Sequence, residues 1–295
     1  MTNWTAADIP RLSGMTALVT GATSGIGYHT ALQLAAHGAH VLLGARAPDR
    51  ADRAVAGIRA AVPAAKVDPV LADLADLTAV RDAAAGVLAA HDHIDLLINN
   101  AGEKFVARRR VTRDGFETQF GTNHLGHFAL TGLLLPALLR RAGARVVTMT
   151  SIAHRLFGMD FDDPQHARRY SASRAYGRSK LATLLFALEL DRRLHGHGGA
   201  ISLAAHPGIA TEPVPRSLGR LIVQSMADGA LPSLYAATSP TVEGGQLYGP
   251  GNLVRTKGSP RLERPSARAR DAAAGRRLWD LSETLTGVRY DFARP

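Results

Sequence analysis

Short apolar runs alternate with longer stretches at helical spacing through the first two thirds of the chain. The short runs predict six strands, at residues 16–20, 40–43, 66–71, 94–98, 145–149 and 201–205. The longer stretches predict helices at residues 27–36, 51–61, 77–90, 116–139 and 174–194. Strands that alternate with helices form right-handed crossovers and a parallel sheet. The pattern therefore predicts an α/β Rossmann fold, a doubly wound parallel sheet with helices on both faces.

The last third of the chain has a weaker pattern. Residues 207–215 and 248–265 are typical of loops, residues 218–227 predict a helix, and residues 276–285 predict a closing helix. No linker rich in Pro, Gly or Ser divides the chain before residue 207, and 295 residues suit one large domain. We expect a single domain over residues 1–295. Its core would span 16–211, followed by a mobile substrate lid at about 212–245 and a C-terminal tail.

A glycine-rich turn joins the first strand to the first helix. Gly21 permits a tight turn, Gly25 lets the backbone approach a pyrophosphate, and Gly27 lets the helix pack closely on the strand. The N-terminus of the helix then offers free N–H groups and a partial positive charge to the phosphates. The sequence therefore predicts a dinucleotide site that includes Gly21, Thr23, Ser24, Gly25, Ile26 and Gly27.

The residue that ends the second strand indicates which dinucleotide is preferred. An acidic residue there would bind a ribose hydroxyl and favour NAD(H), whereas Arg46 favours the extra phosphate of NADP(H). Asp49 lies three residues further on and keeps NAD(H) open as the less favoured cofactor. We expect NADP(H).

Four further segments follow in a fixed order. They are Asp73-Leu74 after the third strand, Asn99-Asn100-Ala101-Gly102 after the fourth, Ser151 after the fifth, and Tyr176-Gly177-Arg178-Ser179-Lys180 on the next helix. With the glycine turn, this order resembles the short-chain dehydrogenase/reductase family over about residues 16–211. Residues 119–128 (QFGTNHLGHF) are similar to the subgroup of retinol dehydrogenases, protochlorophyllide reductases and the WW-domain oxidoreductase. The resemblance implies an oxidoreductase that moves a hydride between nicotinamide and an alcohol or carbonyl substrate.

Tyr176 and Lys180 are four residues apart and share one face of their helix. A free tyrosine titrates near 10 and is a poor base at neutral pH. A cation one turn away would stabilise the phenolate and lower the pKa of the tyrosine. The spacing therefore predicts that Tyr176 is the general acid or base of the reaction.

The resemblance assigns roles to several other residues. Ser151 would hydrogen-bond the reacting oxygen, and Asn123 would hold a water that links Lys180 to solvent. The remaining cofactor contacts would come from Asp73, Leu74, Asn100, Ala101, Gly102, Pro207, Gly208 and Ile209. The backbone near Ile209 would meet the nicotinamide carboxamide. Thr211 comes one residue earlier than the family's usual position, so its contact with the cofactor stays open.

Residues 154–169 lengthen the segment between Ser151 and Tyr176 beyond the usual family spacing. We expect them to form a loop at the mouth of the site, and their apolar side chains favour a lipophilic substrate. One alternative is a catalytically silent NADP(H)-binding regulator or scaffold, although such proteins tend to lose the tyrosine or the lysine. A light-dependent reductase is disfavoured, because it would need a cysteine that this chain lacks.

Composition narrows the remaining possibilities. The absence of cysteine excludes disulfides, thiolate catalysis and Cys-based metal sites. His124 and His127 have no carboxylate at helical spacing, so we expect polar core residues and no metal site. The net charge of +10 is interpreted as a solvated surface rather than a nucleic-acid site. The longest apolar stretch, 130–139, is too short for a membrane anchor, and a cytoplasmic location is expected. Monomer, homodimer and homotetramer all remain open.

Overall fold

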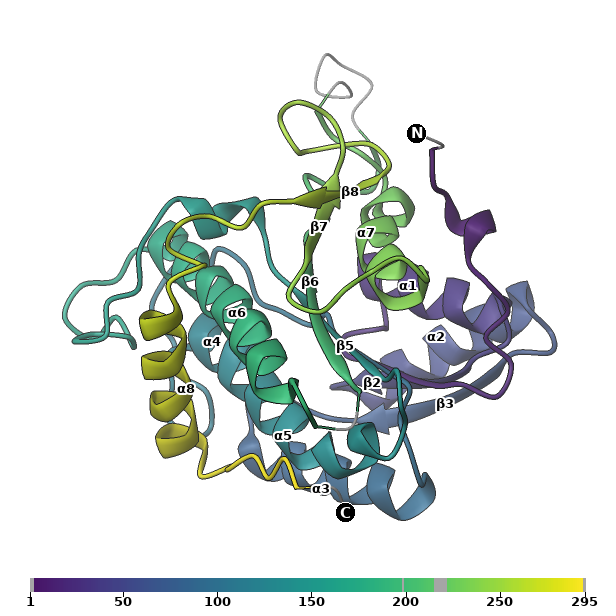
Figure 1. Cartoon of the computed structure of the whole chain (residues 1–295), viewed down its shortest axis with the longest axis horizontal. Helices are drawn as coiled ribbons and strands as arrows, with labels where there is room; N and C mark the ends of the chain where they lie inside the picture. Colours follow the sequence, from purple (N-terminus) through teal and green to yellow (C-terminus); the bar gives the residue numbers. More distant parts are fainter. Residues whose placement is uncertain (1–2, 198, 215–221, 294–295) are drawn as a thin grey trace.

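An eight-stranded sheet forms the centre of the protein (Figure 1). The computed structural model describes all residues except 1–2, 198, 215–221 and 294–295. The strand order is β3-β2-β1-β4-β5-β6-β7-β8. The strands are β1 (Thr16–Val19), β2 (His40–Ala45), β3 (Lys66–Leu71), β4 (Leu96–Asn99), β5 (Arg145–Met149), β6 (Ile201–Ala205), β7 (Leu247–Pro250) and β8 (Pro260–Glu263). β1 to β7 run parallel and β8 is antiparallel, so the predicted Rossmann sheet is confirmed.

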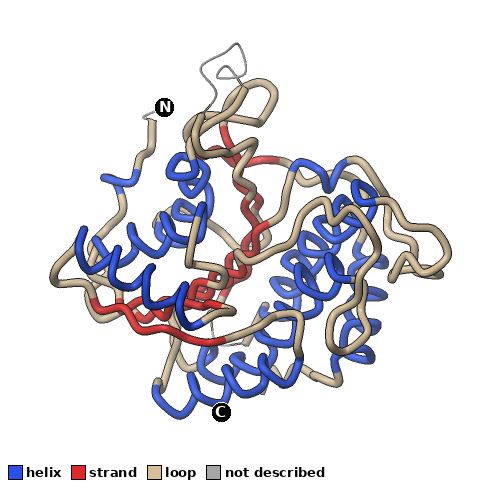
Figure 2. The backbone as a smooth tube through the Cα atoms, turned by 180° about the vertical axis from the view of Figure 1, so that it is seen from behind, coloured by secondary structure: helices blue, strands red, loops and turns tan. Residues whose placement is uncertain are grey.

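Helices cover both faces of the sheet, as the view from behind also shows (Figure 2). One face carries α1 (Gly25–Ala36), α2 (Pro48–Ala61) and α7 (Met226–Thr238). The other carries α3 (Leu77–Ala90), α5 (Gly126–Leu139), α6 (Ala172–Leu194) and α8 (Ala272–Thr286). A hydrophobic core lies on each face of the sheet, and neighbouring residues of β1 pack into different ones. Val19 packs on the first face and Leu18 on the second. Strands buried on both faces explain the continuous apolar runs in the sequence.

The helix predicted at residues 116–139 begins two residues later and changes type along its length. It consists of α4 (Thr118–Phe120), a π-helical turn (Gly121–Leu125) and α5. The carboxylate of Glu117 accepts hydrogen bonds from the first N–H groups of α4, which fixes where the helix starts. A π turn carries one extra residue per turn and often marks a functional site. Asn123 lies within this one.

Several predictions for the last third are wrong. Residues 248–265 are not all loop, because short β7 and β8 pair within them, and four-residue strands containing Gly or Pro leave no periodic signal. Residues 218–221 of the predicted helix lie outside the described residues. Gln224 forms a bridge with Ala210, and the helix begins only at Met226. Residues 226–238 of the predicted lid form α7, which packs against α1, and the mobility of the lid stays a prediction.

The closing helix is confirmed as α8, and it lies beside α6 and α5 with the tail that follows it (Figure 1). The Trp279 ring lies 5.1 Å from the Phe128 ring, and the Tyr290 hydroxyl donates to the carbonyl of Phe128 at 2.6 Å. A Cβ on Gly132 of α5 would lie 2.6 Å from the Tyr290 ring, so a glycine permits this close contact. The C-terminal segment therefore covers the outer face of α5 and α6.

Two short 3₁₀ turns complete the fold, one at Ala6–Asp8 and one at Ile152–Arg155. The second follows β5 and carries Ser151 at its start. Across the part of the chain that the structure describes, no helix has the length and apolar character needed to cross a membrane.

Candidate active site

A cavity of about 1110 Å³ opens at the carboxyl ends of the central strands. Its walls come from the turns after β1 to β6, together with α6 and the start of α7. The strand order reverses between β1 and β4, and ligands of such sheets bind at this reversal. Of the predicted site residues, all but Asn123 line the cavity: Gly21, Thr23, Ser24, Gly25, Ile26, Gly27, Arg46, Asp73, Leu74, Asn100, Ala101, Gly102, Ser151, Tyr176, Lys180, Pro207, Gly208 and Ile209.

The glycine turn is packed too tightly for side chains. Gly21 has a φ of +63°, and a Cβ there would lie 2.9 Å from the Cα of Ala101. A Cβ on Gly27 would lie 2.3 Å from the carbonyl oxygen of Gly21 and 2.4 Å from Nδ2 of Asn100. The Asn100 amide donates to the Thr20 carbonyl at 2.8 Å, so it ties the turn after β1 to the segment after β4. The first turn of α1 thus faces the cavity with its N–H groups.

The Thr20 hydroxyl connects this turn to the interior. It accepts the backbone N–H groups of Asn100 at 2.8 Å and Ala101 at 3.0 Å, and it lies 2.8 Å from Nε2 of His127. Nδ1 of His127 lies 2.9 Å from the carbonyl of Asn123, so that nitrogen donates. Burial lowers the pKa of His127 to about 4, so the ring is neutral and Nε2 can accept from the hydroxyl. The histidine predicted as a polar core residue therefore supports the site.

Tyr176 and Lys180 reach the cavity from α6, and Ser151 reaches it from the end of β5. Burial lowers the pKa of Lys180 to about 8, and its ammonium donates to the carbonyl of Met149 at 3.1 Å. Burial raises the pKa of Tyr176, and the hydrogen bond with Ser151 offsets only part of that rise. The prediction that Lys180 lowers the pKa of Tyr176 is wrong for the protein alone, because desolvation dominates.

Asn123 stands behind the wall of the cavity. Its side chain accepts from the N–H of Glu103 at 2.7 Å and donates to the Glu103 carbonyl and the Ser179 hydroxyl, each at 2.9 Å. A Cβ on Gly102 would lie 3.0 Å from Asn123 Oδ1 and 3.5 Å from Lys180 Nζ, so Asn123 and Lys180 approach the same spot. The predicted water relay stays a prediction, while the amide itself fixes the backbone at 102–103.

Two arginines line the cavity near the end of β2. Arg46 lines it and lies 3.6 Å from the carboxylate of Glu103. Arg50, which sequence reasoning missed, lines it as well. Asp49 does not interfere, because its carboxylate binds Arg53 at 2.7 Å. The signal available in the sequence for Arg50 was a second basic residue four positions after Arg46.

The Pro207–Ile209 turn differs from the expected arrangement. The Ile209 N–H donates to the Thr256 carbonyl at 3.0 Å, and the Ile209 carbonyl accepts from the Gln224 N–H at 2.9 Å. Both backbone groups predicted to meet a carboxamide are therefore engaged within the protein. Thr211 donates its N–H to the Gln224 carbonyl and is not among the residues that form the wall.

Only the start of the 154–169 segment lies at the mouth, where Arg155 and Leu156 line the cavity. The rest docks on the protein body: the N–H of Glu117 donates to the side chain of Gln165 at 2.7 Å. The acidic residues are also engaged elsewhere, since Asp160 lies 3.4 Å from Arg178 on α6. The expectation of a mouth loop is therefore wrong for most of the segment.

Apolar side chains surround the catalytic end. The ring of Phe105 lies 4.7 Å from the ring of Tyr176 and is 59% exposed. Ile152 and Leu156, which follow Ser151, also line the cavity, whereas Met226 lies beside the glycine turn at Gly25. Sequence reasoning missed Phe105, because nothing in the pattern indicates that the loop after β4 reaches α6.

A parallel sheet with a glycine turn at the strand reversal and a tyrosine–lysine pair facing the same cavity defines a nicotinamide-dependent oxidoreductase of the α/β class. The family model described as short chain dehydrogenase matches residues 15–217. Human retinol dehydrogenase 13 is 38% identical, covering 98% of this chain and 88% of that protein. Mouse retinol dehydrogenase 12 is 37% identical, covering 95% and 89%.

Among solved structures, an uncharacterised protein from Mycobacterium paratuberculosis superposes with a TM-score of 0.84 at 41% identity, covering 98% of this chain and all of that one. The chain belongs to the short-chain dehydrogenase/reductase family, in its retinol dehydrogenase-like subgroup, and is an NAD(P)-dependent oxidoreductase.

Gly27→Ala tests the packing of the glycine turn. The added methyl group must displace the Gly21 carbonyl or the Asn100 amide, and overpacking costs about 1–3 kcal/mol. We expect dinucleotide affinity, measured by fluorescence titration on folded protein, to fall by roughly tenfold or more. The control is Gly86→Ala in α3, where a Cβ meets nothing within 4 Å and affinity should not change. An affinity within twofold of wild type for Gly27→Ala would contradict this account.

Proposed function

We propose that the protein is an NADP(H)-dependent oxidoreductase for a lipophilic alcohol, ketone or aldehyde. The observation that carries this proposal is the position of Ser151, Tyr176 and Lys180 on the wall of the cavity that the glycine turn also forms. When bound there, the nicotinamide supplies or takes up the hydride.

Each residue has a distinct task in carbonyl reduction. Tyr176 gives its hydroxyl proton to the substrate oxygen as the hydride reaches the carbonyl carbon, and Ser151 donates a hydrogen bond to that oxygen. Lys180, whose ammonium donates to the Met149 carbonyl at the cavity wall, would hold the ribose of the nicotinamide. Burial raises the pKa of Tyr176, so the phenol stays protonated at neutral pH. The protein alone is therefore prepared to donate a proton, the form that reduction needs.

The catalytic end favours a lipophilic substrate. Phe105, Ile152 and Leu156 present apolar surface there. Exposed apolar side chains of this size contribute to binding when a substrate removes them from water. The names of the similar retinol dehydrogenases agree with this class of substrate.

A catalytically silent NADP(H)-binding scaffold is the second candidate function. The engaged backbone of Ile209 is the observation that favours it, because a carboxamide would have to compete for both groups. The placement of Tyr176 and Lys180 in the cavity favours the enzyme.

Tyr176→Phe separates these two functions. Removing the hydroxyl removes the proton donor, and such groups contribute roughly 10²- to 10⁴-fold to rate. We expect kcat to fall by that factor in a ketone and aldehyde panel, with NADPH affinity within twofold of wild type. Tyr235→Phe is the matched control, since the Tyr235 hydroxyl lies 3.2 Å from the Thr241 hydroxyl and Tyr235 is not part of the cavity wall. Turnover near that of the control in Tyr176→Phe would refute the assignment of Tyr176 as proton donor.

Cofactor preference is proposed to depend on Arg46, with help from Arg50. A hydrogen bond to a charged group is worth about 1.5–3 kcal/mol, so loss of the phosphate contact should matter strongly. Arg46→Asp should lower the NADPH/NADH ratio of kcat/KM by roughly 10- to 100-fold. Arg140→Asp, the same change at an exposed residue outside the cavity wall, should leave the ratio unchanged. An equal NADPH/NADH ratio of kcat/KM in the two variants would contradict the assignment of cofactor preference to Arg46.

We also propose that the protein is a monomer in solution. The outer face of α5 and α6 is covered by α8 and by the ring of Tyr290, so it is not available to pair with a second copy of the chain. Size-exclusion chromatography with light scattering should give the mass of one chain, 31.3 kDa, at micromolar concentration. A stable mass of two or four chains would show that another face, or a displaced tail, forms an interface.

A further inference from the structure

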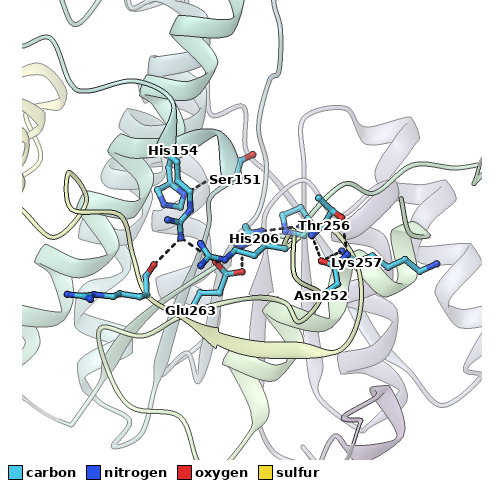
Figure 3. Close-up of polar contacts among 12 residues, drawn as sticks. Ser151, His154, His206, Asn252, Thr256, Lys257 and Glu263 are labelled. Carbon is cyan, nitrogen blue, oxygen red and sulfur yellow. Dashed lines mark hydrogen bonds and ion pairs between the residues drawn. The ribbon is translucent and has the colours of Figure 1, made fainter. Parts of the chain in front are cut away.

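A buried carboxylate from β8 connects two turns of the cavity wall (Figure 3). Glu263 is 8% exposed, and its Oε1 lies 2.9 Å from Nε2 of His206. Its Oε2 lies 3.5 Å from Arg155 and 3.5 Å from Arg255. Burial raises the pKa of Glu263, but the His206 bond and the two guanidinium groups more than offset this, so the net pKa is lowered. Glu263 is therefore an anion with three cationic or hydrogen-bonding partners.

His206 connects Glu263 to the Pro207–Ile209 turn through two hydrogen bonds of its imidazole ring. The N–H of Gly208 donates to Nδ1 of His206 at 3.2 Å, so Nδ1 carries no hydrogen and Nε2 donates to Glu263. The imidazole is completely buried at the end of β6. The carboxylate thus fixes the orientation of the ring, and the ring fixes the backbone at Gly208.

Arg155 connects Glu263 to the turn that carries Ser151. The 3₁₀ turn begins at Ser151, whose hydroxyl accepts the N–H of Ala153 at 3.2 Å, and it ends at Arg155. The Arg155 guanidinium also donates to the carbonyl of Arg264, directly after β8, at 3.0 Å. The residue at the end of the turn is therefore anchored to β8 by two contacts.

The loop between β7 and β8 makes a second set of contacts with the Pro207–Ile209 turn. Thr256 accepts the N–H of Ile209, and a Cβ on Gly208 would lie 2.2 Å from the Thr256 carbonyl oxygen. Asn252 shapes this loop, because its side chain accepts the Thr256 N–H at 2.8 Å and donates to the Thr256 hydroxyl at 3.2 Å. Figure 3 shows His206 between Glu263 on one side and Asn252 and Thr256 on the other. The hairpin and the turn form one connected unit.

We propose that Glu263 is a positioning residue for hydride transfer: through Arg155 and His206 it fixes the Ser151 turn relative to the Pro207–Ile209 turn. This inference rests on the proposed role of Ser151. The two turns follow the adjacent parallel strands β5 and β6, and both line the cavity. Buried ion pairs add little net stability compared with well-packed apolar residues. Alignment of reacting groups, in contrast, is sensitive to shifts of about 1 Å.

Glu263→Gln is the first test, because it removes the charge and keeps the size of the side chain. We expect kcat to fall roughly 10- to 100-fold, since a misplacement of about 1 Å can cost that much. Hydride transfer should also limit the rate more strongly, so the primary deuterium isotope effect with deuterated NADPH should increase. The matched control is Glu243→Gln, the same change at an exposed residue before β7, which should alter neither quantity. Circular dichroism gives the folded fraction of each variant.

Two further variants each remove one contact of Glu263, the first with Arg155 and the second with His206. Arg155→Met should lower kcat and raise the isotope effect, with NADPH affinity within twofold of wild type. His206→Asn retains an acceptor near Nδ1 for Gly208 but loses the bond to Glu263, and it should weaken NADPH binding several-fold. The affinity measurement needs no turnover, so it distinguishes a failure of this inference from a failure of the proposed substrate class.

A merely structural role predicts a different result. In that case kcat would fall in proportion to the folded fraction, while the isotope effect would stay at the wild-type value. That result for Glu263→Gln, or for Arg155→Met where Glu263→Gln does not fold, would overturn the inference. If His206→Asn binds NADPH as tightly as the wild type, the inferred role of His206 in fixing the Pro207–Ile209 turn would be overturned.

Discussion

The close approach of two backbone turns is the constraint on which the site depends. The turn after β1 and the segment after β4 are so near each other that a Cβ at Gly27 would lie 2.3 Å from a carbonyl oxygen. The Asn100 amide and the Thr20 hydroxyl fasten the two segments together with hydrogen bonds of 2.8 Å. Glycine is required there by the space available, and the same closeness brings the N-terminus of α1 to the cavity.

The same contacts extend from the phosphate end to the catalytic end. Thr20 contacts His127, His127 contacts the carbonyl of Asn123, and the Asn123 side chain contacts Ser179, next to Lys180. The π turn makes this possible, because its extra residue lets Asn123 reach both the segment after β4 and α6. Burial keeps His127 neutral, so the connection is made of dipoles and needs no compensating charge. Cofactor and catalytic regions are therefore parts of one polar network inside an apolar core.

The sequence predicted those features that depend on local spacing. Strands buried on both faces, the glycine turn and the Tyr176–Lys180 pair all come from short-range patterns, and the cavity brings their residues together. The sequence did not predict β7 and β8, because four-residue strands leave no periodic signal. It also failed for Phe105 and Glu263, whose neighbours lie far away along the chain. Contacts of that kind are decided by packing, which no local pattern encodes.

The two catalytic side chains show why burial, and not only spacing, decides their chemistry. Tyr176 and Lys180 lie one helical turn apart, which suggests that the ammonium lowers the pKa of the phenol. Desolvation, however, acts on both groups and disfavours the charged form of each. The pKa of Lys180 falls to about 8, while that of Tyr176 rises. A neutral phenol is suited to give a proton to a carbonyl oxygen. To accept a proton from an alcohol, the same tyrosine would have to be a phenolate, and burial disfavours that form. Spacing on the helix brings the two side chains to one cavity, whereas desolvation sets the protonation state that each side chain favours there.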